Sequence, residues 1–156
     1  MSRIMYVLCG ISGAGKSTWA NTCAAVHDNY VVVSSDAIRK ELYGDESVQK
    51  NPKEVFNIAY IRIKNCLELG YDVIFDATNL KARDRKNFLK WMDENVEEEV
   101  WRHTHKEIMV FECPLKNAIM HQQFRTRQVP SFVVERQYKQ FERPTEEEGW
   151  DRILYM

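Results

Sequence analysis

The stretch Gly10–Thr18 limits the fold of this chain more than any other feature of the sequence. It fits G-x-x-x-x-G-K-[ST], a pattern that binds phosphates when a strand precedes it and a helix follows. The apolar run Ile4–Cys9 predicts that strand, buried on both faces because its apolar residues do not alternate with polar ones. The residues from Ser17 to Val26 predict the helix. This context favours a nucleotide-binding loop over a chance glycine-rich turn.

The residue types in this loop suit a bound triphosphate. Glycines let the backbone adopt conformations that other residues avoid, so that successive N–H groups can turn inward. The helix start adds unpaired N–H groups and the positive end of the helix dipole. We expect Lys16 to bind the β- and γ-phosphates and the Ser17 hydroxyl to ligate Mg²⁺. The residues expected to bind ATP or another nucleoside triphosphate here are Gly10, Ser12, Gly13, Ala14, Gly15, Lys16, Ser17 and Thr18.

Length and composition predict one globular domain that spans residues 1–156. The formal net charge of −1 gives no global attraction to nucleic acid or membrane, so any site for a polyanion must be a local patch. The four cysteines form no C-x-x-C pair, which favours buried free thiols in a reducing cytosol. The sequence has neither a signal peptide nor an apolar run of membrane-spanning length, so we expect a cytoplasmic protein.

Predicted strands alternate with predicted helices along the chain. The strands are expected at 4–9, 30–33, 72–76, 107–112 and 150–155, and the helices at 17–26, 37–43, 52–69, 81–94, 115–127 and 131–142. The segment 95–106 has no clear assignment. This alternation around a P-loop predicts an α/β P-loop NTPase fold: a three-layer sandwich with a mainly parallel sheet of about five strands and a helical lid at about 115–143.

Two local details accompany this prediction. Ser35 or Asp36 is expected to cap the helix at 37–43. Val134, Tyr138 and Phe141 recur at helical spacing and are expected to form the buried side of the last helix.

Parallel sheets bind their ligands beyond the carboxyl ends of the strands, where the polar stretches of this chain should meet. Asp36 is the leading candidate for a base that accepts a proton from an attacking hydroxyl, and helix capping is its alternative role. Arg39 lies one helical turn later. Its guanidinium can hold a phosphate of the acceptor, or it can remain a solvated surface charge.

The third predicted strand ends in Asp76-Ala-Thr-Asn79. Asp76 can orient a Mg²⁺-bound water or the Ser17 hydroxyl, and Thr78 can donate to a phosphate of the acceptor. Alternatively, Asp76, Thr78 and Asn79 only cap the turn that follows the strand.

Arg125 and Arg127 stand at the end of a predicted helix, just before Pro130. From a mobile lid, such arginines stabilise the charge that is transferred with a phosphoryl group. The alternative is a favourable interaction with the helix dipole.

Two further groups have open roles. The basic residues of the helix at 81–94 form either a solvated face or a surface that meets a nucleic-acid backbone. They are Lys81, Arg83, Arg85, Lys86 and Lys90. His103 and His105 alternate as on one face of a strand, but they lack a third ligand of suitable spacing, which favours solvated histidines over a metal pair.

Together these motifs resemble those of the polynucleotide 5′-hydroxyl kinases, which include a phage enzyme's kinase domain and the kinase modules of bacterial repair proteins. The resemblance extends from Ile4 to about Phe141. It rests on Gly10–Thr18, Ser35-Asp36-x-x-Arg39, Asp76-Ala-Thr-Asn79, and Arg125 with Arg127 before Val129-Pro130.

The resemblance implies roles for individual residues. Lys16 and Ser17 would bind ATP and Mg²⁺, and Asp36 would be the general base. Arg39 and Thr78 would hold the phosphate next to the reacting hydroxyl, with Asp76 and Asn79 beside them in the acceptor site. Arg125 would act from the lid and would contact the nucleotide together with Arg127.

One position departs from this family. His121 stands where family members often carry another arginine, so either Arg127 substitutes for that arginine or the contacts to the donor are weaker. The chain also has no phosphatase or ligase module of the kind often fused to such kinases. Processing of both ends would then need a separate phosphatase or ligase as a partner.

Three functions follow, in order of preference. The first is transfer of the γ-phosphoryl group of ATP to a 5′-hydroxyl end of DNA or RNA. The second keeps the fold and takes a small metabolite, nucleoside or peptide as acceptor. The third is a nucleotide-binding module without transfer activity, to which His121 lends some weight.

Overall fold

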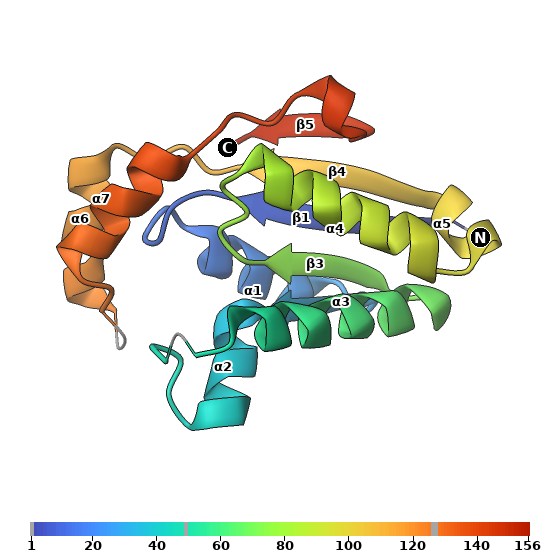
Figure 1. Ribbon diagram of the computed structural model, residues 1–156, viewed down its shortest axis with the longest axis horizontal. Helices are drawn as coiled ribbons and strands as arrows, with labels where there is room; N and C mark the ends of the chain where they lie inside the picture. The colour runs from blue at the N-terminus through green and yellow to red at the C-terminus, as the bar shows by residue number, and fades with distance from the viewer. Residues whose placement is uncertain (1, 49, 126–127) are drawn as a thin grey trace.

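The computed structural model describes residues 2–48, 50–125 and 128–156. At its centre lies a sheet of five parallel strands in the order β2-β3-β1-β4-β5. Figure 1 shows the labelled strands pointing toward one edge, so the carboxyl ends of the strands lie together. The strands are β1 (Arg3–Cys9), β2 (Tyr30–Ser34), β3 (Asp72–Asp76), β4 (Thr104–Val110) and β5 (Arg152–Tyr155).

Helices cover both faces of this sheet. Helix α1 (Lys16–Val26) lies on one face, where Ala20 packs with Leu8 and Ile74. Helices α3 (Pro52–Glu68) and α4 (Ala82–Asn95) lie on the other face. The stripe that α3 buries against the sheet recurs at helical spacing and consists of Val55, Ala59, Ile63 and Leu67. The predicted three-layer α/β sandwich is therefore confirmed, and its sheet is parallel throughout.

Several segments differ from the sequence-based expectation, among them the strand predicted at 107–112, which is β4 at Thr104–Val110. Helix α2 (Ser35–Tyr43) begins one residue earlier than the proposed caps allow, because the Ser34 hydroxyl accepts a hydrogen bond from the Ala37 N–H at 3.2 Å. The unassigned segment forms a short helix, α5 (Glu98–Arg102), which leads directly into β4. The Thr104 hydroxyl joins the two by donating to the Val100 carbonyl at 2.7 Å.

The expected lid lies beyond the carboxyl edge of the sheet (Figure 1). It consists of α6 (Leu115–His121), the 3-10 turn η1 (Gln122–Phe124) and α7 (Ser131–Gln140). The helix predicted at 115–127 therefore stops at His121. Tyr138, predicted to be buried, is 52% exposed, because α7 packs on the rest of the chain through a narrow stripe that includes Val134.

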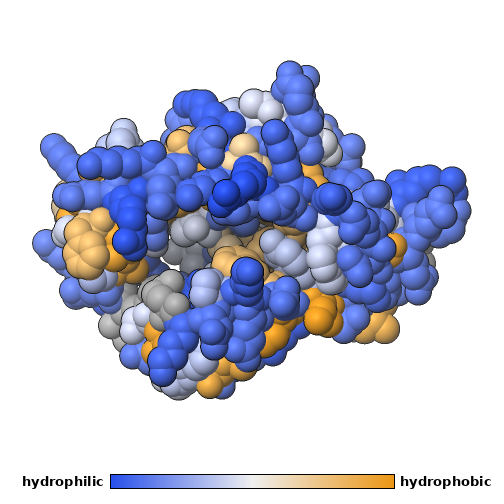
Figure 2. Space-filling view, viewed as in Figure 1, coloured by the Kyte–Doolittle hydropathy of each residue, from blue (hydrophilic) through white to orange (hydrophobic). Residues whose placement is uncertain are grey.

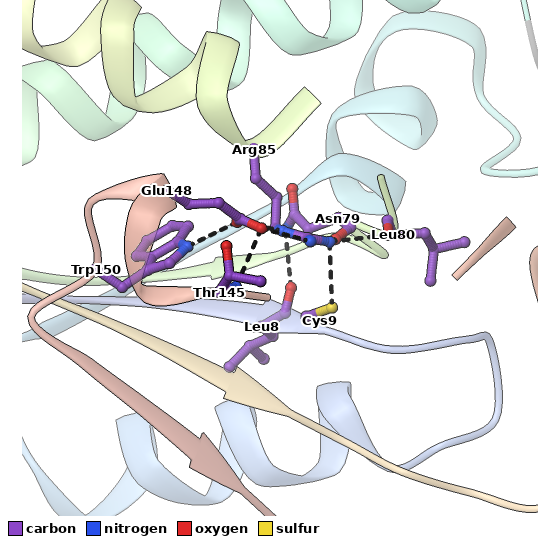
Figure 3. Close-up of polar contacts among 8 residues, drawn as sticks. All are labelled: Leu8, Cys9, Asn79, Leu80, Arg85, Thr145, Glu148 and Trp150. Carbon is purple, nitrogen blue, oxygen red and sulfur yellow. Dashed lines mark hydrogen bonds and ion pairs between the residues drawn. The ribbon is translucent and has the colours of Figure 1, made fainter. Parts of the chain in front are cut away.

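A buried ion pair fixes the turn that follows β3 (Figure 3). Arg85 of α4 donates to the Glu148 carboxylate from Nε at 2.8 Å and from Nη2 at 3.0 Å. Its Nη1 donates to the Asn79 and Leu80 carbonyls at 2.9 and 2.8 Å. Glu148 belongs to the 3-10 turn η2 (Glu146–Glu148) and also accepts from Trp150 Nε1 at 3.0 Å. The pair thus links the C-terminal part of the chain to the turn after β3.

This pair corrects one sequence-based interpretation. Arg85 belongs neither to a solvated face nor to a surface that meets nucleic acid, because both side chains of the pair are almost fully buried, at 0% and 1% exposed. Burial by itself would raise the pKa of Glu148, but the bonds from Arg85 and Trp150 outweigh that effect and keep the pKa low. The pattern of basic residues on α4 therefore does not indicate which of them has a partner in the protein interior.

Within the described residues, no helix is both long and apolar enough to cross a lipid bilayer. All four cysteines are free, with Cys9 buried and the other three half-buried.

Candidate active site

A cleft of about 1040 Å³ opens at the carboxyl edge of the sheet. Figure 2 shows the surface hollowed between the part of the molecule that carries α7 and the part that carries α2. Most of the residues that the sequence singled out line this one cleft, so the predicted convergence of separate motifs occurs. They are Ser12, Gly13, Ala14, Gly15, Lys16, Ser17, Thr18, Asp36, Arg39, Asp76, Thr78 and Arg125.

The phosphate-binding loop depends on two different properties of glycine. Gly13 and Gly15 have φ angles of 88° and 99°, in the left-handed region that other residues rarely adopt. Gly10 is needed for space instead, because a Cβ there would lie 2.8 Å from the Phe111 carbonyl oxygen. Helix α1 starts at Lys16 without a side-chain cap, so its first N–H groups remain available to an anion.

Lys16 is the buried cation of this loop. It is 7% exposed, and its Nζ donates to the Ile11 carbonyl at 2.9 Å. Burial lowers the pKa of Lys16 from 10.5 to about 8, although the nearby Asp76 carboxylate acts in the opposite direction. A triphosphate in the cleft would raise the pKa of Lys16 again, because an anion favours the ammonium.

Ser17 and Asp76 meet across the loop. The Ser17 hydroxyl donates to Asp76 Oδ2 at 2.7 Å, and Asp76 is 7% exposed at the end of β3. Burial raises the pKa of Asp76, while the Ser17 hydroxyl and the Lys16 ammonium pull it back down. This contact matches the expectation that Asp76 orients the Ser17 hydroxyl.

Asp36 and Arg39 form an ion pair in the lining of the same cleft. Arg39 Nη1 lies 2.9 Å from Asp36 Oδ1, one helical turn along α2. The Arg39 side chain is 10% exposed and the Asp36 side chain 38%, so the carboxylate is the more accessible partner. The Arg39 guanidinium also lies over the Phe56 ring, 6.0 Å from its centroid. These contacts hold Arg39 in place and leave part of Asp36 open to the cleft.

In the turn after β3, the side chains of the candidate residues Thr78 and Asn79 lie in different surroundings. Thr78 lines the cleft, and its carbonyl accepts a hydrogen bond from the Gly10 N–H at 2.9 Å. Asn79 turns instead toward β1, because its Nδ2 donates to the Leu8 carbonyl at 2.8 Å (Figure 3). Its φ of 46° shows why asparagine suits this position, since it tolerates the left-handed region. The side chain of Asn79 thus shapes the turn that presents Thr78.

The lid contributes Arg125 and His121 to the cleft. Arg125 is close enough to act electrostatically on both Lys16 and Asp76. His121 Nδ1 lies 2.8 Å from the Gly13 carbonyl. A carbonyl only accepts, so Nδ1 carries the proton in this contact. The position of the expected arginine is therefore used to hold the lid on the loop. Arg127 lies outside the described residues.

Sequence reasoning missed the four residues of α7 that line the cleft. The Gln137 side-chain oxygen accepts from the Ser12 N–H at 2.8 Å, which joins the lid directly to the phosphate-binding loop. Arg136 precedes it and also lines the cleft. Together with Val133 and Gln140 these residues follow an i, i+3, i+4, i+7 pattern, which was a detectable signal. The apolar residues Val134, Tyr138 and Phe141 form a second stripe at helical spacing, and by hydrophobicity alone that stripe is the stronger signal.

The oxygen atoms in the cleft could supply only part of the coordination shell of a Mg²⁺ ion. Among the described residues, no group of three or more His, Cys, Asp or Glu side chains is arranged to hold a metal. Mg²⁺ sites of nucleotide enzymes typically use one or two protein oxygens, together with phosphates and water. The Ser17 hydroxyl and the Asp76 carboxylate supply oxygens of this kind side by side.

The two histidines considered as a metal pair lie elsewhere. His103 and His105 are half exposed and lie beside Glu and Asp side chains.

Comparison with known proteins gives a family model and several relatives. The model, AAA_33, described as an AAA domain, matches residues 5–147. A curated relative is the L-seryl-tRNA(Sec) kinase of Methanococcus maripaludis, which is 26% identical to this chain. The alignment covers 95% of this chain and 56% of the relative. The chain therefore spans little more than half of that protein.

Solved structures give the same fold at lower identity. A chain of the Pnkp1/Rnl/Hen1 RNA repair complex superposes with a TM-score of 0.70 at 24% identity, covering 89% of this chain and 44% of that one. A gluconokinase from Sinorhizobium meliloti 1021 superposes with a TM-score of 0.61 at 19% identity, covering 99% and 81%. Identities this low establish a shared kinase-like fold and leave the acceptor open.

Proposed function

The chain belongs to the AAA_33 family and has a P-loop kinase-like fold, which implies nucleotide binding, and from this premise we propose that it is an ATP-dependent kinase of polynucleotide 5′-hydroxyl ends. The observation that carries the proposal is the Asp36–Arg39 pair, which faces the same cleft as Lys16, Ser17 and Asp76. A carboxylate with an adjacent guanidinium suits an acceptor that carries both a hydroxyl and a phosphate.

In this proposal the chain's own side chains divide the work. The phosphate-binding loop and Lys16 hold the donor, and Asp36 accepts the proton of the attacking hydroxyl. The acceptor oxygen forms a bond to the γ-phosphorus as the bond to the bridging oxygen breaks, and ADP leaves. Arg39 and Thr78 position the acceptor through its phosphate, and Arg125 offsets charge on the transferred group.

Mg²⁺ would be held by the Ser17 hydroxyl, which the Asp76 carboxylate orients through a hydrogen bond. When bound, it neutralises charge on the β- and γ-phosphates. The residues that surround this position fit it, since hydroxyl and carboxylate oxygens are the ligands that Mg²⁺ prefers.

A second candidate acceptor is a hydroxyl carried by an aminoacyl-RNA. The 26% identity to an L-seryl-tRNA(Sec) kinase favours it over an unrelated metabolite. Both candidates place a polynucleotide at the cleft but differ in the group that is phosphorylated. A panel of acceptors separates them: a 5′-hydroxyl oligonucleotide, the same oligonucleotide with a 5′-phosphate, seryl-tRNA and gluconate.

Transfer from labelled ATP to the 5′-hydroxyl oligonucleotide alone is the result expected. In that assay, Asp36→Asn should lower kcat by roughly 10²- to 10⁴-fold, the usual contribution of a general base, and leave ATP affinity unchanged. Asn keeps the size of the side chain and an oxygen for Arg39. The matched control is Asp28→Asn, an exposed carboxylate in the turn between α1 and β2, which should leave kcat unchanged. ATP binding without transfer to any acceptor would favour a non-catalytic nucleotide-binding module and refute the proposal.

A further inference from the structure

The cleft carries a cation that the proposed chemistry does not use. Arg136 lines the cleft from α7 and is exposed, and its side chain makes no hydrogen bond or ion pair with any other residue in the described part of the chain. Its neighbour Gln137 is bonded to the Ser12 N–H, so this face of α7 is held at the phosphate-binding loop. An unpaired guanidinium held over a phosphate site is suited to bind another phosphate.

The charge of the cleft supports a polyanionic ligand. The chain as a whole carries a net charge of −1. The cleft lining nevertheless contains four cationic side chains and two carboxylates, a local excess of positive charge within the described residues. The cations are Lys16, Arg39, Arg125 and Arg136, and the carboxylates are Asp36 and Asp76.

Arg136 lies toward the outside of this group, because it is exposed whereas Lys16 and Arg39 are buried. The cleft also has an exposed aromatic residue on the lid, because Phe124 is 81% exposed and lines it. A cation and an exposed ring in the lining of one cleft are the combination that binds single-stranded nucleic acid, where the cation contacts the backbone and the ring stacks on a base.

We propose that Arg136 and Phe124 form an outer subsite for the acceptor strand, in which Arg136 binds a backbone phosphate and Phe124 stacks on a base. This proposal rests on the proposed function, and it makes a single strand longer than one nucleotide the preferred acceptor. The residues serve recognition and take no part in phosphoryl transfer.

The test compares acceptors that do and do not reach this subsite. A nucleoside 3′-phosphate has a 5′-hydroxyl and one phosphate, whereas a single-stranded octanucleotide with a 5′-hydroxyl extends along the lid. Arg136→Gln should raise KM for the octanucleotide by about tenfold, the effect of losing one charge-assisted hydrogen bond, at unchanged kcat. It should leave KM for the nucleoside 3′-phosphate and Kd for ATP unchanged. It should also lower the salt dependence of octanucleotide binding by about 0.7 in the log–log slope, the contribution of one phosphate contact on a single strand.

Phe124→Leu provides the test of stacking. We expect weaker octanucleotide binding, by about tenfold in Kd measured by fluorescence anisotropy, with no change in salt dependence. Helix α7, which carries Arg136, offers matched controls in Lys139→Gln and Phe132→Leu, which change exposed residues outside the lining of the cleft. Both controls should bind and phosphorylate the octanucleotide as the unmodified protein does.

Each alternative outcome refutes a defined part of the argument. If Arg136→Gln weakens ATP binding, Arg136 belongs to the donor site and the outer subsite is wrong. If it raises KM equally for both acceptors, or for neither, the subsite is also wrong while the proposed kinase activity stands. If the unmodified protein phosphorylates seryl-tRNA or gluconate and no oligonucleotide, both the proposed function and the subsite fail.

Discussion

Arg85→Met should lower the free energy of unfolding by about 3–5 kcal/mol, the usual cost of leaving one partner of a buried ion pair without the other. The structure points to this range because Arg85 makes two bonds to Glu148 and one to each of the Asn79 and Leu80 carbonyls, all between 2.8 and 3.0 Å. Methionine fills a similar volume, so the loss reports on charge and hydrogen bonding more than on a cavity.

The measurement is urea unfolding followed by tryptophan fluorescence, with the free energy obtained by linear extrapolation. Trp150 is bonded to Glu148 and is therefore a local probe. Arg83→Met is the matched control, because Arg83 lies on the same helix with its side chain 77% exposed. The control should change the free energy of unfolding by no more than about 0.5 kcal/mol.

A second variant separates uncompensated charge from lost packing. Arg85→Met combined with Glu148→Gln removes the buried negative charge and keeps an oxygen for Trp150. We expect the double variant to be more stable than Arg85→Met alone by at least about 1 kcal/mol, because an unpaired buried carboxylate costs more than a neutral amide. An Arg85→Met protein as stable as the control, or a double variant no more stable than the single one, would refute the reasoning.

Two other predictions concern the phosphate-binding loop. Because the pKa of Lys16 is lowered to about 8, the lysine is charged below that pH and neutral above it in the free protein. ATP favours the charged form, so ATP affinity should fall as pH rises above about 8, with proton uptake on binding that calorimetry in two buffers detects; Lys16→Met should abolish this pH dependence. Gly13→Ala should destabilise the protein more than Gly15→Ala, because a Cβ at Gly13 would lie 2.7 Å from the Ala118 carbonyl, whereas nothing lies within 4 Å of one at Gly15. Both variants carry about 1–2 kcal/mol of backbone strain. The difference between their free energies of unfolding in urea therefore measures the clash at Gly13 alone.

Either prediction has a clear contrary result. ATP affinity that stays constant from pH 7 to 10, on either side of a lysine pKa near 8, would mean that Lys16 keeps its charge without a ligand. Equal destabilisation by the two alanine substitutions would mean that the lid moves away from Gly13 at no cost.

Local pattern was sufficient for much of the fold and site. The loop from Gly10 to Thr18, the strands and most helices follow from apolar periodicity and glycine placement, because these reflect contacts within a short stretch of chain. The rule that ligands meet the carboxyl edge of parallel strands then brought Asp36 and Asp76 to one cleft.

Residues whose partners are distant in sequence were beyond this reasoning. Arg85 looked like its basic neighbours on α4, and only the fold places Glu148 beside it. The sequence predicts that the Asn79 side chain lies in the acceptor site, but this side chain donates a hydrogen bond to the backbone of β1 instead. Gln137 could not be linked to Ser12 from the sequence, because their bond depends on how α7 lies on the loop.

The bond between Glu148 and Arg85 also bears on how this protein is made. During synthesis the helices and the strand that carry Lys16, Asp36 and Asp76 emerge well before residues 145–150. Until Glu148 arrives, Arg85 has no carboxylate to meet, and the turn that presents Thr78 lacks one of its supports. A nascent chain that stops short of this segment also lacks β5, so β4 would be an uncovered edge strand, which chaperones that bind exposed strands could recognise.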